Sequence, residues 1–196
     1  MPDINNMGKV NHDYGVCGFT SSLYALYTHS PGNQDYLSKA GDKKLRVAAE
    51  IKTYLQILKS EDSSLLAETA AFTRSFQGSY SGFTIAEYIR KINSMTSSAA
   101  TAESVDISIA LPPDAVVKYL RDICNLRSAK IVDASASPHE AVVGVKNGDA
   151  KFKLYDGLCH YVYKRGSTIY SWGKQFTSVS DADASFSPCV MISTSG

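Results

Sequence analysis

A chain of 196 residues, with 44% hydrophobic and 20% charged residues, has the composition of one soluble globular domain, so residues 1–196 are expected to fold as a single unit. The formal net charge is +1 and no run of five like charges occurs, which argues against nucleic acid as a partner. No stretch has the length and apolar character of a membrane span. The N-terminus lacks the apolar core of a secretory signal, so the protein is expected to stay in the cytoplasm or to leave the cell by a signal-independent route.

The first half of the chain is predicted to be helical. A glycine turn around residue 17 is followed by Phe19, Leu23, Leu26 and Tyr27, which recur at helical spacing. Further helices are expected over residues 44–59, 63–76 and 84–93, each with apolar residues on one face. The Ser- and Ala-rich stretch 94–104 predicts an exposed loop that separates the two halves of the chain.

The second half is predicted to consist mainly of strands. A helix is expected to begin at Pro112-Pro113 and to run to about residue 124, because proline is tolerated in the first turn. Strands are expected at 129–132, 141–145, 152–155, 161–164, 168–171 and 190–193. Asn147-Gly148 between the apolar runs 141–145 and 152–155 is a strong hairpin signal. Helices followed by antiparallel strands indicate an α+β fold.

The cysteine pattern excludes several kinds of site. The four cysteines, Cys17, Cys124, Cys159 and Cys189, are widely spaced and form no CxxC pair, so neither a zinc knuckle nor a redox dithiol is predicted. The GxxxxGK[ST], GxGxxG and HExxH motifs are also absent. We therefore expect no metal and no cofactor. We also expect the four thiols to be free, and one of them is a candidate nucleophile.

Cys17 is that candidate. It lies between two glycines at the predicted start of a helix, where free N–H groups and the positive end of the helix dipole stabilise a thiolate. A small buried core residue is the ordinary alternative for a single free cysteine. The position of Cys17 thus indicates a nucleophile only if a base is found for it.

His139 and Asp156 are the predicted partners of Cys17. From His139 the chain is expected to run along one strand, turn at Asn147-Gly148, and return along a second strand that ends at Asp156. The two ends of a hairpin are neighbours, so Asp156 would orient the imidazole while its other nitrogen faces the thiol. Taken singly, a histidine after a proline turn and an Asp-Gly turn are ordinary surface features. His160 remains the alternative base.

Two segments of the sequence resemble papain-like cysteine peptidases. NHDYGVCGFTSSLYAL is similar to the helix that carries the nucleophile of that family, and SPHEAVVGVKNGDAKFKLYDG is similar to its histidine–strand–turn–strand unit. The resemblance implies a papain-like fold with Cys17 as nucleophile, His139 as base and Asp156 as the orienting residue. Asn11 stands where the family has the glutamine of the oxyanion hole, with Asp13 and the Cys17 N–H as other candidates.

A third similarity points to a different histidine. Ser171-Trp172-Gly173 is similar to the Ser-Trp-Gly that follows the orienting asparagine in papain. Tyr170 stands where that asparagine would be, and His160 is only ten residues before it. We interpret this similarity as a coincidence at the level of sequence.

The resemblance implies acyl transfer on a protein or peptide substrate, as in a protease or amidase. A glutamine deamidase or transglutaminase would use the same site chemistry, and so would a peptidoglycan amidase. Small domains of this type resemble bacterial effectors and toxins that are secreted without a signal peptide and that pair with an immunity protein or chaperone. The rival expectation is a non-catalytic binding module that keeps the papain-like shape.

Overall fold

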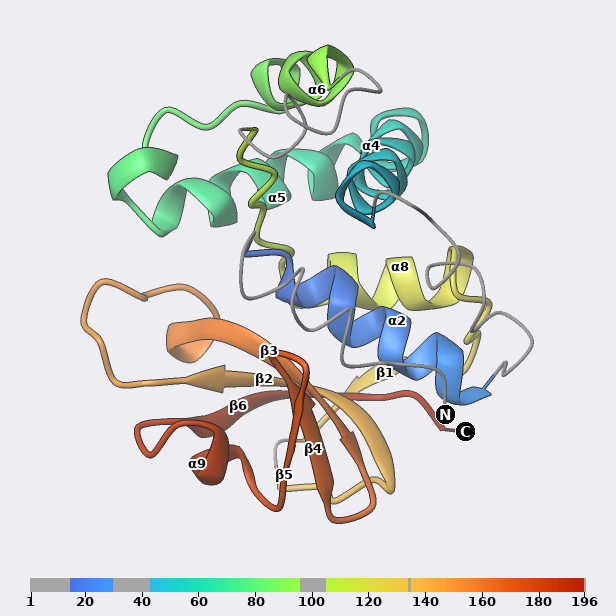
Figure 1. The fold of residues 1–196 in the computed structure, drawn as a ribbon, viewed down its shortest axis with the longest axis vertical. Coiled ribbons are helices and arrows are strands. Elements are labelled where there is room, and N and C mark those ends of the chain that lie inside the picture. Colours follow the sequence, from blue (N-terminus) through green and yellow to red (C-terminus); the bar gives the residue numbers. More distant parts are fainter. Residues whose placement is uncertain (1–14, 30–42, 96–104, 134, 196) are drawn as a thin grey trace.

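The computed structural model describes residues 15–29, 43–95, 105–133 and 135–195. Helices occupy the first half of the chain and an antiparallel sheet occupies the second half (Figure 1), which confirms the predicted α+β class. None of the helices in these ranges is long and apolar enough to cross a membrane.

The helices begin close to where the sequence predicts them. Those of the first half are α2 (Cys17–His29), α4 (Lys43–Glu61), α5 (Ser63–Ser75) and α6 (Ile85–Ser94), with a 3₁₀ turn at Gly78–Tyr80; α8 (Pro113–Asp122) and the short α9 (Val179–Ala182) follow. Asp62 caps α5 by accepting a hydrogen bond from the N–H of Leu65, and Thr84 caps α6 in the same way. Pro113 occupies the first turn of α8, as expected.

The sheet has six strands in the order β1-β6-β2-β3-β4-β5, and every neighbouring pair is antiparallel. The strands are β1 (Lys130–Val132), β2 (Glu140–Lys146), β3 (Leu158–Arg165), β4 (Thr168–Ser171), β5 (Lys174–Phe176) and β6 (Ser187–Ser193). The strand β3 pairs with β2 along its whole length, from Glu140 opposite Arg165 to Lys146 opposite Leu158.

The predicted strand at 152–155 is wrong. Residues 147–154 form a loop and Tyr155–Gly157 forms a 3₁₀ turn, so the hairpin partner of β2 begins only at Leu158. The rings of Phe152 and Tyr155 pack against Phe76 and Phe72 at α5 instead of extending the sheet. Tyr155 also has a φ of +50°, which a strand residue cannot adopt.

Helix α2 lies between the sheet and the helices α4, α5 and α6 (Figure 1) and packs chiefly against β3 and α8. All residues from Gly18 to Ala25 are buried, including four with hydroxyl groups. Thr20 and Ser22 donate hydrogen bonds to carbonyls one turn earlier, which lowers the cost of burying them. A second apolar cluster covers the opposite face of the sheet, with Val143, Val162 and Met191 among its members.

Candidate functional site

Cys17 is the first residue of α2, as the sequence predicts, and it lines a pocket of about 180 Å³. The pocket lies between the start of α2, the end of α5 and the first residues of β3. Its other lining residues are Gly15, Thr73, Phe76, Tyr80, Ser108, Ile109, Ala110, Cys159, His160 and Trp172. Cys17 therefore borders a partly open pocket in which apolar and aromatic groups predominate.

The Cys17 thiol is protonated at neutral pH. Burial raises its pKa to about 11, although the main-chain N–H groups of Tyr161 and Gly18 act in the opposite direction. The sequence predicts a thiolate favoured by the start of the helix, but the loss of hydration outweighs the N–H groups. The resting state at this site is thus a neutral thiol.

His160 is the histidine that shares this pocket with Cys17. It lies on β3, three residues before Tyr163, the first residue of β3 that pairs with β4. Its Nε2 is 2.9 Å from the hydroxyl oxygen of Ser171, and its ring stacks on Trp172 with centroids 4.7 Å apart and planes 13° apart. Burial lowers the pKa of His160 to about 4, so the imidazole is neutral, with one nitrogen that donates and one that accepts.

The predicted proximity of His139 to Cys17 is wrong. His139 precedes β2 with its side chain 73% exposed. His29, at the far end of α2, lies 2.6 Å from Glu140, so β2 starts beside the end of the helix opposite Cys17. Thirteen helical residues separate these two ends by about 18 Å at 1.5 Å a residue.

The predicted contact between His139 and Asp156 is also wrong. Asp156 lies past the other end of β2, where it accepts a hydrogen bond of 2.5 Å from the Lys146 ammonium. In a hairpin, the start of the first strand lies beside the end of the second strand. The second strand is β3, so the residue beside the start of β2 is Arg165. The length of β2 therefore separates the two residues by about 20 Å at 3.3 Å a residue.

The remaining predicted residues of the site cannot be placed. Asn11 and Asp13 lie outside the described residues, so their proposed roles in the oxyanion hole stay predictions. Within the described ranges, no group of three or more His, Cys, Asp or Glu side chains could hold a metal ion. The four cysteines are free, as expected.

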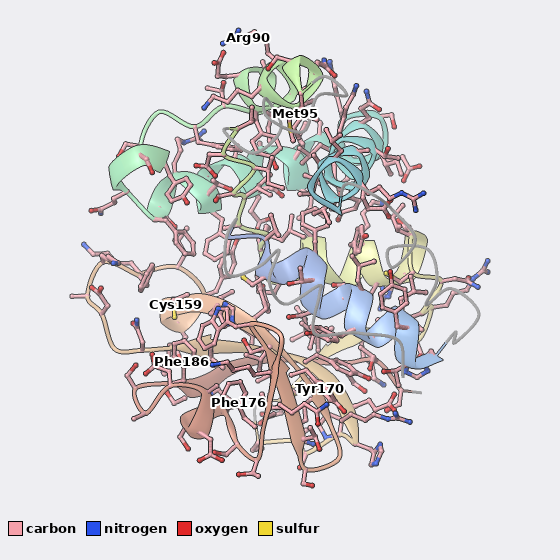
Figure 2. All side chains as sticks on the ribbon, viewed as in Figure 1. Arg90, Met95, Cys159, Tyr170, Phe176 and Phe186 are labelled. Carbon is pink, nitrogen blue, oxygen red and sulfur yellow. The ribbon has the colours of Figure 1, made fainter. Side chains whose placement is uncertain are left out.

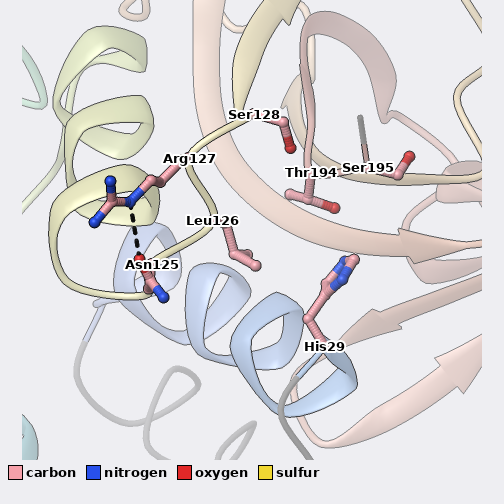
Figure 3. A pocket seen from close by; sticks show the side chains of 7 residues that line it. All are labelled: His29, Asn125, Leu126, Arg127, Ser128, Thr194 and Ser195. Carbon is pink, nitrogen blue, oxygen red and sulfur yellow. Dashed lines mark hydrogen bonds between the residues drawn. The ribbon is translucent and has the colours of Figure 1, made fainter.

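A larger cavity of about 640 Å³ lies at the opposite end of α2, lined by His29, Asn125, Leu126, Arg127, Ser128, Thr194 and Ser195 (Figure 3). It contains hydroxyl groups and an imidazole but no cysteine. The His29 imidazole lies 2.6 Å from the buried Glu140 carboxylate, a contact that gives this histidine a structural role. Size therefore does not identify the reactive site, and the smaller pocket at Cys17 is the better candidate.

Comparison of the chain with protein-family models, with curated proteins and with solved structures found no match. The geometry alone therefore identifies the candidate site. One signal in the sequence pointed to it: Ser171-Trp172-Gly173, interpreted as a coincidence, places Ser171 and Trp172 on the imidazole of His160.

Proposed function

We propose that this chain is a cysteine hydrolase in which Cys17 is the nucleophile, His160 the base and Ser171 the residue that orients the base. One observation carries the proposal: Cys17 and His160 line the same pocket, and Nε2 of His160 lies 2.9 Å from the hydroxyl oxygen of Ser171. In the tautomer in which Nε2–H donates to the Ser171 hydroxyl oxygen, Nδ1 carries the lone pair that can accept the proton of the thiol. Ser171 takes the role that was predicted for Asp156.

The reaction begins from neutral partners. A pKa of about 11 for Cys17 and of about 4 for His160 favour the thiol and the imidazole over the ion pair. The difference of about seven pH units corresponds to roughly 10 kcal/mol before the attraction between the two charges is counted. His160 therefore takes the proton as the sulfur attacks the carbonyl carbon, not before.

The rest of the acyl transfer follows from the same groups. The N–H groups of Gly18 and Tyr161 stabilise negative charge that develops on the sulfur. The imidazolium then protonates the leaving group, and water hydrolyses the thioester with His160 again as base. A protein or peptide substrate, deamidase or transglutaminase activity, and a role as a bacterial effector or toxin rest on the resemblance alone.

The second candidate is a non-catalytic binding module of papain-like shape. The protonation states favour it, because a raised pKa at Cys17 and a lowered pKa at His160 are opposite to those of a resting ion pair. In such a module, the aromatic pocket would bind a side chain of a partner protein without chemistry.

The acyl-enzyme distinguishes the two functions. We expect p-nitrophenyl acetate to release nitrophenolate in a burst and to leave an acetyl group that peptide mapping by mass spectrometry locates on Cys17. Cys17→Ala removes the burst, and Cys159→Ala, a matched change in the same pocket, retains it. Acetyl groups spread evenly over the four thiols, or a burst that survives in Cys17→Ala, would contradict the hydrolase and favour the binding module.

A further inference from the structure

Two aromatic rings, those of Trp172 and Phe186, contact the imidazole of His160. Besides its stack on Trp172, the imidazole faces Phe186, with centroids 5.8 Å apart and planes 24° apart. Phe186 is also 5.8 Å from the Trp172 ring, at 34°. A phenyl ring on the opposite face of the imidazole would be about 10 Å from the indole, the sum of two stacking distances. Phe186 therefore supports the stacked pair from the side and contacts both members.

The backbone at Trp172 makes that support necessary. Trp172 and Gly173 form the two-residue turn between β4 and β5, in which Ser171 pairs with Lys174, and both have positive φ, +46° and +74°. Glycine adopts this conformation freely, but a bulky residue is strained there by about 1–2 kcal/mol. The strained position brings the indole over the imidazole, so ring contacts have to compensate for it.

Phe186 is itself held in place by a turn. Its N–H donates to the carbonyl of Asp183 at 2.9 Å, and both the N–H and the hydroxyl of Ser185 donate to the Asp183 carboxylate. This turn joins α9 to β6 and directs Phe186 onto the sheet face away from α2. Phe176 packs in the same apolar cluster (Figure 2), but no ring contact joins it to His160 within the described residues.

We propose that Phe186 is a positioning residue for the base: it keeps the imidazole of His160 stacked on Trp172, with Nε2 within hydrogen-bond distance of Ser171. The role in catalysis rests on the proposed function, while the support of the ring does not. Among the described residues, the titratable side chains that line the pocket with His160 are Cys17, Tyr80 and Cys159, and Asp183 lies in the turn that carries Phe186. Burial, and no charged group, is the cause of the lowered pKa of His160.

The titration of His160 tests the proposal without substrate. With histidine labelled with ¹³C and ¹⁵N, NMR follows the imidazole of wild type, Phe186→Ala and the matched control Phe176→Ala as the pH is lowered. Opening one side of the ring to water should raise the pKa of His160 in Phe186→Ala by about one unit or more, toward its unperturbed value. The Nε2 resonance should also lose the signature of its hydrogen bond to Ser171. Phe176→Ala should titrate as wild type does.

If the alanine variant is unstable, the conservative Phe186→Leu is used in its place because it preserves the fold. We expect the pKa of His160 to rise in this variant too, but by less than in Phe186→Ala. An unchanged titration of His160 in the folded Phe186 variant would overturn the proposal, as would an equal shift in Phe176→Ala. Failure of the hydrolase would show separately, as absence of the acetyl group on Cys17 in wild type.

Discussion

The rate at which Cys17 reacts with iodoacetamide should rise tenfold per pH unit throughout the neutral range. The thiolate is the reactive form, and a pKa of about 11 leaves about one thiol in ten thousand ionised at pH 7. An unperturbed cysteine with a pKa near 8.5 is about 3% ionised at the same pH. Cys17 should therefore react roughly 300 times more slowly than free cysteine at pH 7.

The measurement is alkylation at a series of pH values between 6 and about 10, with each cysteine followed by peptide mapping and free cysteine as the reference. Burial raises the pKa of Cys189 to about 11 and that of Cys159 to about 12, and raises that of Cys124 further. The expected order is thus Cys17 and Cys189 first, Cys159 next and Cys124 last. A rate for Cys17 that is already independent of pH below about pH 8 would refute the reasoning, because it would indicate a resting thiolate–imidazolium pair.

Two substitutions test other parts of the structure. Asp156→Asn should leave the acylation of Cys17 unchanged and lower the free energy of unfolding only slightly, because it removes an exposed ion pair with Lys146. Loss of acylation in this variant would show that Asp156 belongs to the site. Gly144→Ala should lower the free energy of unfolding in urea by about 1–3 kcal/mol. The added methyl would lie 2.7 Å from Leu158 and 3.0 Å from Val190, and an unchanged midpoint would show that this part of the sheet repacks freely.

Local signals in the sequence predict the helices well. Asp62 and Thr84 cap helices where polar residues precede apolar periodic runs, and Pro113 marks the first turn of α8. The glycine turn before Cys17 likewise predicts the start of α2. These features depend on hydrogen bonds within a few residues of each other, so the sequence carries the information directly.

The errors arise where contacts between distant residues decide the outcome. Asn147-Gly148 is a hairpin signal, but Phe152 and Tyr155 pack on α5 and delay the returning strand to Leu158. That shift moves Asp156 to the wrong end of β2 for a contact with His139. The pairing of His160 with Ser171 depends on the turn at Trp172, which local patterns predict poorly because a bulky residue at positive φ is rare.

The acetylation of Cys17 in two histidine variants tests the central claim most directly. His160→Gln and His139→Gln make the same chemical change at a buried and at an exposed position, and the burst with p-nitrophenyl acetate is measured in both. His160→Gln should slow the acetylation of Cys17 by about 100-fold or more, the usual contribution of a general base, and His139→Gln should leave it unchanged. If the acetylation of Cys17 were slow in His139→Gln and unchanged in His160→Gln, the account would be contradicted.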